Sequence, residues 1–88
     1  MHYVYILECA DGSLYTGSTN DLAGRVHKHN TEKAGAHYTK IRRPVLLKYS
    51  DVCATYAAAR TREAAIKQMS RKEKLELIKS SPHGFTSV

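Results

Sequence analysis

The feature that most constrains the fold is a short turn signal between two runs of strand-forming residues. Segment 2–9 is dense in β-branched and aromatic residues, and a second such run begins at Leu14. Asp11 and Gly12 lie between the two runs, and an Asp-Gly pair in this position is typical of a β-hairpin turn. The sequence therefore predicts that the chain opens with two antiparallel strands, the second of them over residues 14–17.

Tyrosines gather on this predicted hairpin. Because side chains alternate between the two faces of a strand, Tyr3 and Tyr5 share one face, and Tyr15 and Gly17 share a face on the other side of the turn. We expect the three phenols to lie close together on a small patch of sheet. Aromatic cross-strand pairs also stabilise sheets, and that structural role is the alternative to a chemical one.

The remaining sequence predicts one more strand and three helices. The expected ranges are helix 22–30, strand 45–49, helix 55–69 and helix 70–80. The order β-β-α-β-α-α predicts an α+β fold, with a small three-stranded, mainly antiparallel sheet flanked by helices. A chain of 88 residues has room for one small domain. We assign that domain to residues 1–80 and expect residues 81–88 to form a flexible tail.

Each predicted helix is preceded by residues that can cap its N-terminus. These residues are Asn20 or Asp21, then Thr55, then Ser70. The segment from Ser70 to Glu73 also matches a capping box, in which the two side chains bond each other's backbone N–H groups. In this last helix we expect Leu75 and Ile78 to form the buried side.

The chain is strongly basic. Lys and Arg number 14 against 8 acidic residues, which gives a net charge of +6 and a pI near 9.5. Such an excess on a small domain favours a polyanionic partner, although many small proteins are basic for solubility alone. No apolar run approaches the roughly 20 residues that cross a bilayer, and no signal peptide is recognisable. Cys9 and Cys53 lack metal-type spacing, so we expect two buried thiols in a reduced, cytoplasmic protein.

Three polar residues outside the hairpin suit phosphodiester chemistry. Arg25 and His29 are one helical turn apart and share a helix face. Arg25 could grip a phosphate with its two-point fork, or could be an ordinary solvated residue. Glu63 lies on an apolar helix stripe, where a charged side chain needs a partner. Glu63 either pairs with Lys67 or binds a divalent metal, since Mg²⁺ often takes one carboxylate together with water and phosphate oxygens.

Hydrolysis also needs a group that takes a proton from water. Tyr5 and Tyr15 are candidates by position, but an ordinary phenol has a pKa near 10 and is seldom ionised at neutral pH. His29 has a better suited pKa and could accept the proton directly or through a tyrosine. The sequence leaves this choice open.

The order and spacing of these residues resemble the GIY-YIG nuclease family, most of all its small stand-alone (UPF0213-like) single-domain members. Tyr-Val-Tyr at 3–5 stands in place of Gly-Ile-Tyr, and Tyr-Thr-Gly at 15–17 in place of Tyr-Ile-Gly. Features typical of the small members are Asp11-Gly12, the segment 18–21, Arg43-Pro44 and the segment 63–71. Two departures are Tyr3 in place of the opening glycine and the lack of an asparagine after Glu63.

The resemblance implies a metal-dependent endonuclease that cleaves DNA. It assigns Tyr5, Tyr15, Arg25, His29 and Glu63 to the catalytic site, with Glu63 as the ligand of Mg²⁺ or Mn²⁺. A separate set of basic side chains is expected to contact flanking phosphates without reading sequence. These nucleic-acid-binding candidates are Lys40, Arg42, Arg43, Arg71, Lys72 and Lys74.

The substrate class is less defined than the chemistry. Duplex, branched and single-stranded DNA all fit, and RNA stays open as well. Family members often gain specificity from an added DNA-binding domain, so a protein partner could supply it here. The alternative function is a non-catalytic nucleic-acid-binding module, which would not require Glu63. A small protein-interaction domain has no positive sign in the sequence.

Overall fold

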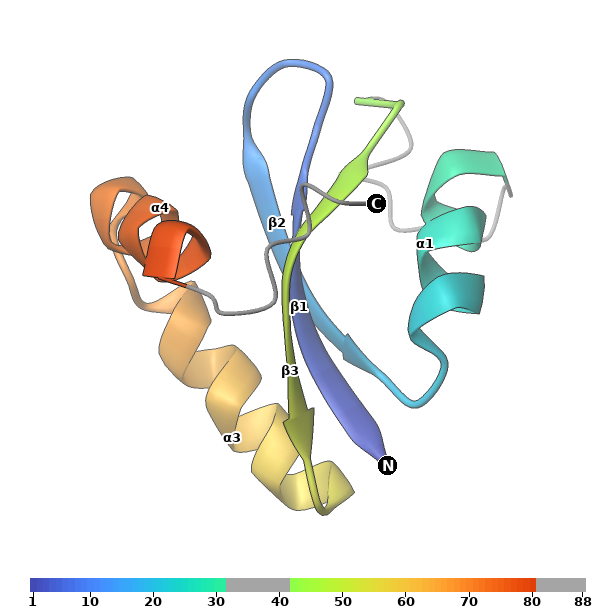
Figure 1. Ribbon diagram of the computed structural model, residues 1–88, viewed down its shortest axis with the longest axis vertical. Helices are drawn as coiled ribbons and strands as arrows, with labels where there is room; N and C mark the ends of the chain where they lie inside the picture. The colour runs from blue at the N-terminus through green and yellow to red at the C-terminus, as the bar shows by residue number, and fades with distance from the viewer. Residues whose placement is uncertain (32–41, 81–88) are drawn as a thin grey trace.

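The computed structural model describes residues 1–31 and 42–80 (Figure 1). Its elements follow the predicted order of strand, strand, helix, strand, helix, helix. They are β1 (His2–Glu8), β2 (Leu14–Thr19), α1 (Leu22–Thr31), β3 (Leu46–Cys53), α3 (Tyr56–Lys67) and α4 (Arg71–Ser80). The predicted α+β fold is therefore confirmed. The predicted tail at 81–88 and the candidate Lys40 lie outside the described residues.

The three strands form one antiparallel sheet in the order β2-β1-β3, so β1 is central and β2 lies at an edge. Gly12 in the β1–β2 turn has a φ of +85°, which glycine adopts readily. In the hairpin Tyr5 pairs with Gly17, and Leu7 pairs with Tyr15. The two tyrosine motifs therefore lie side by side on neighbouring strands.

Two of the strands are longer than the sequence indicated. β2 continues past Gly17 to Thr19, and β3 spans Leu46–Cys53 where the prediction ended at residue 49. The reason is pairing with the central strand, because β1 pairs with β2 from Tyr3 to Glu8 and with β3 from His2 to Glu8, with one register shift between Ile6 and Leu7. Ladder pairing of this kind overrides the weak strand preference of residues such as Ser50 and Asp51.

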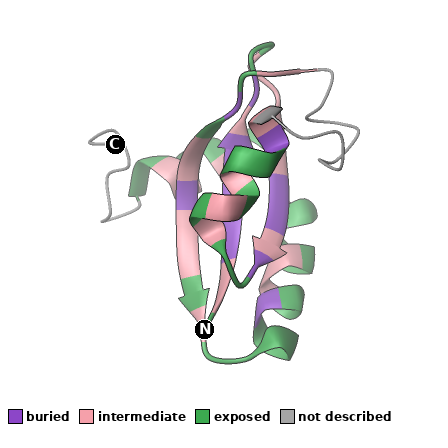
Figure 2. Cartoon of the chain, turned by 90° about the vertical axis from the view of Figure 1, so that its right-hand side faces the viewer, coloured by how far each residue is buried: buried purple, intermediate pink, exposed green. Residues whose placement is uncertain are grey.

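Alternation along β1 divides the core into two layers. Val4 and Ile6 face one side, where Tyr49 and Ile66 complete a buried cluster beneath α3 and α4. On the other side, a second buried cluster consists of Tyr5, Leu7, Cys9 and Val45, and α1 packs on it through Leu22 and Val26. Helices thus cover opposite faces of the sheet, with α1 on one face and α3 and α4 on the other (Figure 1). Figure 2 shows the buried residues concentrated in the strands, with exposed surface on the helices.

Capping residues define the helix starts as predicted. Asp21 accepts a hydrogen bond from Gly24 N through Oδ1 at 3.1 Å, and Thr55 Oγ1 accepts one from Ala58 N at 3.0 Å. At α4, Glu73 N donates to Ser70 Oγ at 3.1 Å, and Ser70 N donates to Glu73 Oε1 at 2.8 Å. This reciprocal pair is a complete capping box.

Two burial predictions were wrong in part. Leu75 is exposed, whereas Leu77 and Ile78 pack against the core beneath α4. The contact of α4 with the core is thus made by Leu77 and Ile78, near the C-terminal end of the helix. Of the two thiols, Cys9 is buried and Cys53 only half-buried, since it ends an edge strand. No helix in residues 1–31 and 42–80 has the length and apolar character to cross a membrane.

Candidate active site

The candidate site lies around the C-terminal end of the edge strand β2. At this end α1 begins on one face of the sheet and α3 begins on the other. Between them is a pocket of about 290 Å³ that draws residues from both helices and both hairpin strands. Its lining consists of His2, Ser18, Thr19, Asn20, Arg25, Tyr56, Ala59 and Arg60.

On the α1 side, a tyrosine and a histidine form a buried pair. The Tyr5 hydroxyl lies 3.0 Å from His29 Nε2, and each residue is only 2% exposed. The rings of Tyr5 and His29 meet edge to face with centroids 6.0 Å apart, and the Tyr15 ring lies against the same imidazole at 5.2 Å. The structure therefore brings three of the predicted site residues into one contact cluster.

Burial controls the protonation of this cluster. Desolvation, followed by the neighbouring Tyr15, raises the pKa of Tyr5 well above that of an ordinary phenol. Desolvation also lowers the pKa of His29, and the nearby cations Arg25 and Arg43 lower it further. At neutral pH the pair accordingly consists of a protonated phenol and a neutral imidazole. A neutral imidazole can accept a proton, whereas the phenol can only pass one on.

Gly17 makes room for the Tyr5 ring. A Cβ atom placed on Gly17 would lie 2.5 Å from the Tyr5 hydroxyl oxygen and 2.7 Å from Cζ. Neither distance is compatible with van der Waals contact, so any other residue would displace the ring. Gly17, which ends the Tyr-Thr-Gly motif, is thus required because the Tyr5 ring packs closely against its Cα, and not because of its backbone conformation.

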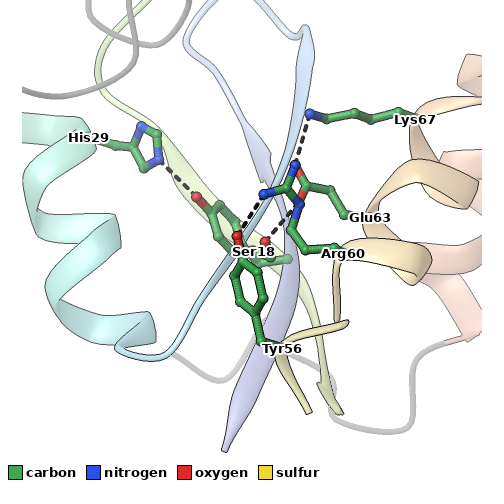
Figure 3. Close-up of polar contacts among 7 residues, drawn as sticks. Ser18, His29, Tyr56, Arg60, Glu63 and Lys67 are labelled. Atoms are coloured by element: carbon green, nitrogen blue, oxygen red, sulfur yellow. Dashed lines mark hydrogen bonds and ion pairs between the residues drawn. The ribbon is translucent and has the colours of Figure 1, made fainter. Parts of the chain in front are cut away.

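On the α3 side, Glu63 is held in a charged network (Figure 3). Its side chain is 13% exposed and accepts a hydrogen bond from Ser18 Oγ at 2.7 Å. Lys67 Nζ lies 2.8 Å from the other carboxylate oxygen, and Arg60 Nε lies 3.6 Å from Oε1. Burial acts to raise the pKa of Glu63, but the hydrogen bonds from Lys67 and Ser18 outweigh it and the net shift is downward. The carboxylate is therefore ionised throughout the physiological range.

Arg25 completes the set predicted from the sequence. It is exposed on α1 and lines the pocket, where Ser18 of the Glu63 network also lies. Arg25 acts to lower the pKa of Tyr5 and Glu63 acts to raise it, so both charges are within electrostatic range of that hydroxyl. Charges from opposite sides of the sheet, Arg25 of α1 and Glu63 of α3, thus both act on the Tyr5 hydroxyl.

Glu63 is the candidate metal ligand of this site. Within residues 1–31 and 42–80, no group of three or more His, Cys, Asp or Glu side chains is placed to hold a metal. The oxygens of Glu63 and Ser18 are hard donors, which suit Mg²⁺ or Mn²⁺ if water and phosphate complete the shell. Lys67 would compete for the same carboxylate. The residues present fit a metal held jointly by protein and substrate.

Of the basic residues predicted to bind flanking phosphates, the five that the structure describes do not line this pocket. Arg42 forms an ion pair with Asp11 at 3.0 Å, next to the β1–β2 turn. Arg43 donates to the carbonyl oxygens of Lys28 and His29 at the end of α1, which is a capping role. The α4 candidates Arg71, Lys72 and Lys74 begin the last helix, and none of them lines the pocket.

Three residues of the site were not assigned a role from the sequence. Ser18, Tyr56 and Arg60 all line the pocket, and Ser18 and Arg60 contact Glu63 directly. The spacing on α3 was the available signal, because Arg60 is three residues before Glu63 and four after Tyr56, which places them on one helix face. Ser18 had a weaker signal, since only the strand register places it opposite α3.

Comparison with known proteins identifies the family. The model of the GIY-YIG catalytic domain matches residues 1–76. The chain belongs to the GIY-YIG family. Its tyrosine motifs, Arg25, His29 and Glu63 all lie inside the matched region.

The relatives found are UPF0213 proteins. UPF0213 protein DP2720 of Desulfotalea psychrophila is 48% identical over 86 residues, covering 98% of this chain and 78% of the relative. A UPF0213 protein of Syntrophus aciditrophicus is 52% identical over 81 residues, covering 92% and 93%. The solution NMR structure of UPF0213 protein BH0048 from Bacillus halodurans superposes with a TM-score of 0.60 at 41% identity, covering 97% and 92%. These names state no activity, but the family implies a nuclease and a nucleic-acid substrate.

Proposed function

We propose that this GIY-YIG domain is a divalent-metal-dependent endonuclease that hydrolyses phosphodiester bonds in DNA. The observation that supports it most is that Arg25 and Glu63, from opposite faces of the sheet, both lie within electrostatic range of the Tyr5 hydroxyl, which contacts His29 Nε2 at 3.0 Å. A module that only bound nucleic acid would need the cation but not a carboxylate held at 13% exposure beside it. A negative charge at a phosphate-binding pocket weakens binding unless a metal ion or a proton step uses it.

Each residue has a distinct role in the proposed reaction. Arg25 grips the scissile phosphate with two N–H groups and stabilises the charge that gathers on its oxygens in the transition state. Glu63, with Ser18, would hold Mg²⁺ or Mn²⁺, which supplies Lewis-acid polarisation of the phosphate. The neutral His29 is the proton acceptor, and Tyr5 connects it to the substrate side.

In the proposed reaction, the oxygen of a water molecule attacks phosphorus while the bond from phosphorus to the leaving oxygen breaks. The leaving oxygen departs with the bonding electron pair and takes up a proton from solvent water. The proton of that water passes to the Tyr5 oxygen as Tyr5 gives its own proton to His29 Nε2, 3.0 Å away. The water meets this pair at the Tyr5 hydroxyl, which lies over Gly17 of the edge strand. Tyr15, which is half-buried and lies against His29, holds the imidazole in place.

A cleavage panel tests the proposal. Labelled duplex, branched and single-stranded DNA, and RNA of the same sequence, are incubated with the protein and Mg²⁺, Mn²⁺ or a chelator. The double variant Arg25→Ala, Glu63→Gln, purified in parallel, controls for contaminating nucleases. We expect internal cleavage of DNA that requires a divalent ion and is lost in the variant. Binding to DNA without cleavage under any condition would instead favour the non-catalytic module, in which Glu63 and Lys67 are a structural ion pair.

A further inference from the structure

A second arginine reaches the same pocket from the opposite helix. Arg60 of α3 lines the pocket together with Arg25 of α1, so two guanidinium groups approach one space from opposite faces of the sheet. Glu63 lies 3.6 Å from Arg60 and is paired with Lys67 at 2.8 Å, although neither Glu63 nor Lys67 lines the pocket. Arg25, Arg60, Lys67 and Glu63 together carry a net charge of +2, which suits a phosphate group whose negative charge increases in the transition state.

The side chain of Tyr56 holds Arg60 in place. Its Nη1 atom donates to the Tyr56 hydroxyl at 2.8 Å, and its Cζ lies 5.7 Å from the centre of the same ring. His2 packs edge-on against that ring with centroids 5.7 Å apart. Figure 3 shows Tyr56 and Arg60 extending from the first turns of α3 toward Ser18 on β2. An arginine restrained in this way loses less conformational entropy when it binds a ligand.

Glu63 does not account for the position of Arg60. The Glu63 carboxylate already accepts a hydrogen bond from Ser18 Oγ at 2.7 Å and pairs with Lys67 Nζ at 2.8 Å. Arg60 Nε lies 3.6 Å from the carboxylate, which is beyond hydrogen-bonding distance. The Arg60 side chain is 60% exposed, and an ion pair so open to solvent contributes little to stability. The restraint by Tyr56 therefore fixes a largely solvent-facing cation at the pocket wall.

We propose that Arg60, positioned by Tyr56, is a second phosphate-binding residue that faces Arg25 across the pocket. The proposal rests on the proposed nuclease function and adds a residue to its substrate site. A pocket of about 290 Å³ is at the lower end of small-ligand sites, and a phosphate with part of its sugar fills it. With Arg25 and Arg60 on either side, the phosphate oxygens are gripped from two directions, which orients the group for in-line attack.

The first test measures the salt dependence of binding. Affinity for a labelled oligonucleotide that the parent protein cleaves is measured in chelator, at a series of salt concentrations. Replacing Arg60 by Ala should reduce the slope of log K against log salt by about 0.7 to 0.9, the value of one phosphate contact. Arg62→Ala is the matched control, because it removes the same charge from the same helix at a residue that does not line the pocket. Its slope should equal that of the parent.

The second test separates charge from positioning. Tyr56→Phe keeps every charge and the ring but removes the hydroxyl that holds Arg60, so the salt slope should stay while the single-turnover rate falls about three- to ten-fold. Arg60→Lys should keep the slope and lower the rate, because a lysine lacks the planar fork. Thermal melts of each variant confirm folding, and Arg60→Gln replaces the alanine variant if that one is unstable.

The outcomes distinguish this proposal from the one on which it rests. Equal salt slopes for parent, Arg60→Ala and Arg62→Ala, with the parent still cleaving, would overturn the role of Arg60 alone. A full rate in Tyr56→Phe would overturn the positioning role of Tyr56. A parent protein that neither binds nor cleaves nucleic acid would remove the nuclease function, whatever the variants do.

Discussion

The two halves of the candidate site differ in how they treat charge. Beneath α1, Tyr5 and His29 are each 2% exposed, and burial keeps both of them neutral. Beneath α3, Glu63 is only partly covered and stays ionised because Ser18 and Lys67 bond it. A proton can be moved through the first half without creating a lasting charge. The second half holds fixed charges at the edge of water, where a phosphate and a metal can be bound.

This difference suggests that proton transfer and phosphate binding can be disturbed separately. Variants on the α3 side should change the dependence on metal ion and salt, whereas variants on the α1 side should change the dependence on pH. Arg25 is part of α1 but lines the pocket together with residues of α3. Variants of Arg25 therefore show whether this residue acts with the proton-transfer half or with the phosphate-binding half.

The largest effect is expected from Glu63→Gln. Glutamine keeps the shape and the bond to Ser18 but loses the charge that binds the metal, so cleavage should fall by at least about 100- to 1,000-fold while DNA binding persists. Single-turnover rates over a range of Mg²⁺ concentrations measure this, with Glu76→Gln on α4 as a control for loss of one acidic charge. Undiminished turnover at saturating Mg²⁺ would show that Glu63 is a structural partner of Lys67.

Arg25→Lys should have the next largest effect. The charge is kept but the two-point fork is lost, so the rate should fall about 10- to 100-fold with substrate affinity changed only a few-fold. Rate and affinity are measured separately by single-turnover kinetics and by binding in chelator. If affinity falls and the rate does not, Arg25 belongs with the residues that only bind flanking DNA.

Gly17→Ala should disturb the α1 half alone. The new methyl group would displace Tyr5 and cost about 1–3 kcal/mol in free energy of unfolding. Denaturant titration measures this cost, and a double-mutant cycle with Tyr5→Phe isolates its cause. The cost should be smaller in the Tyr5→Phe background, because the closest contact, with the hydroxyl oxygen, is gone. Equal costs in both backgrounds would mean that the clash is not with Tyr5.

The pH dependence of the rate should identify the proton acceptor. If His29 accepts the proton, activity needs its neutral form, and the lowered pKa keeps that form abundant down to below pH 6.5. The rate should then be flat near neutrality and fall only under more acidic conditions. A Tyr5 phenolate as the base would instead give a rate that rises about ten-fold per pH unit far into the alkaline range, because its pKa is raised.

The lowered pKa of His29 also makes the stability of the fold sensitive to acid. The unfolded chain has an ordinary His29, which binds a proton near pH 6.5, whereas the folded protein binds it only at lower pH. The contribution of neutral His29 to the free energy of unfolding is therefore full above pH 6.5, and it is lost as the pH falls below that value. Melting temperatures measured between pH 7 and pH 5 should decline more steeply for the parent than for His29→Asn.

Local signals in the sequence were sufficient for most of the fold. The Asp11-Gly12 turn, the Thr55 cap and the capping box at Ser70 each depend on a few adjacent residues, and all three occur as predicted. The length of β3 and the exposure of Leu75 depend on how distant elements meet, which no local pattern contains. For the same reason, no local pattern reveals that Arg60 lines a pocket, because that pocket forms only where α3 and α1 come together in the folded chain.

For the candidate site, residue type and order predict candidate members but not their protonation states or contacts. The sequence left the choice of proton acceptor open, because the burial that raises the pKa of Tyr5 and lowers the pKa of His29 depends on the folded structure. The sequence also predicts that Arg42 and Arg43 contact flanking phosphates, and it does not reveal that Arg42 pairs with Asp11 and that Arg43 caps α1.

The alternation of β2 has a consequence for how this protein can change over evolutionary time. Gly17 accommodates Tyr5 on one face of the strand, and its neighbour Ser18 bonds Glu63 on the other. A single-residue insertion or deletion in the preceding turn that shifted the strand by one position would exchange these faces and dismantle both halves together. Such an insertion or deletion could not remove one half of the candidate site and leave the other half intact. Hairpin length is therefore expected to vary among descendants only in steps that restore the pairing of Tyr5 with Gly17.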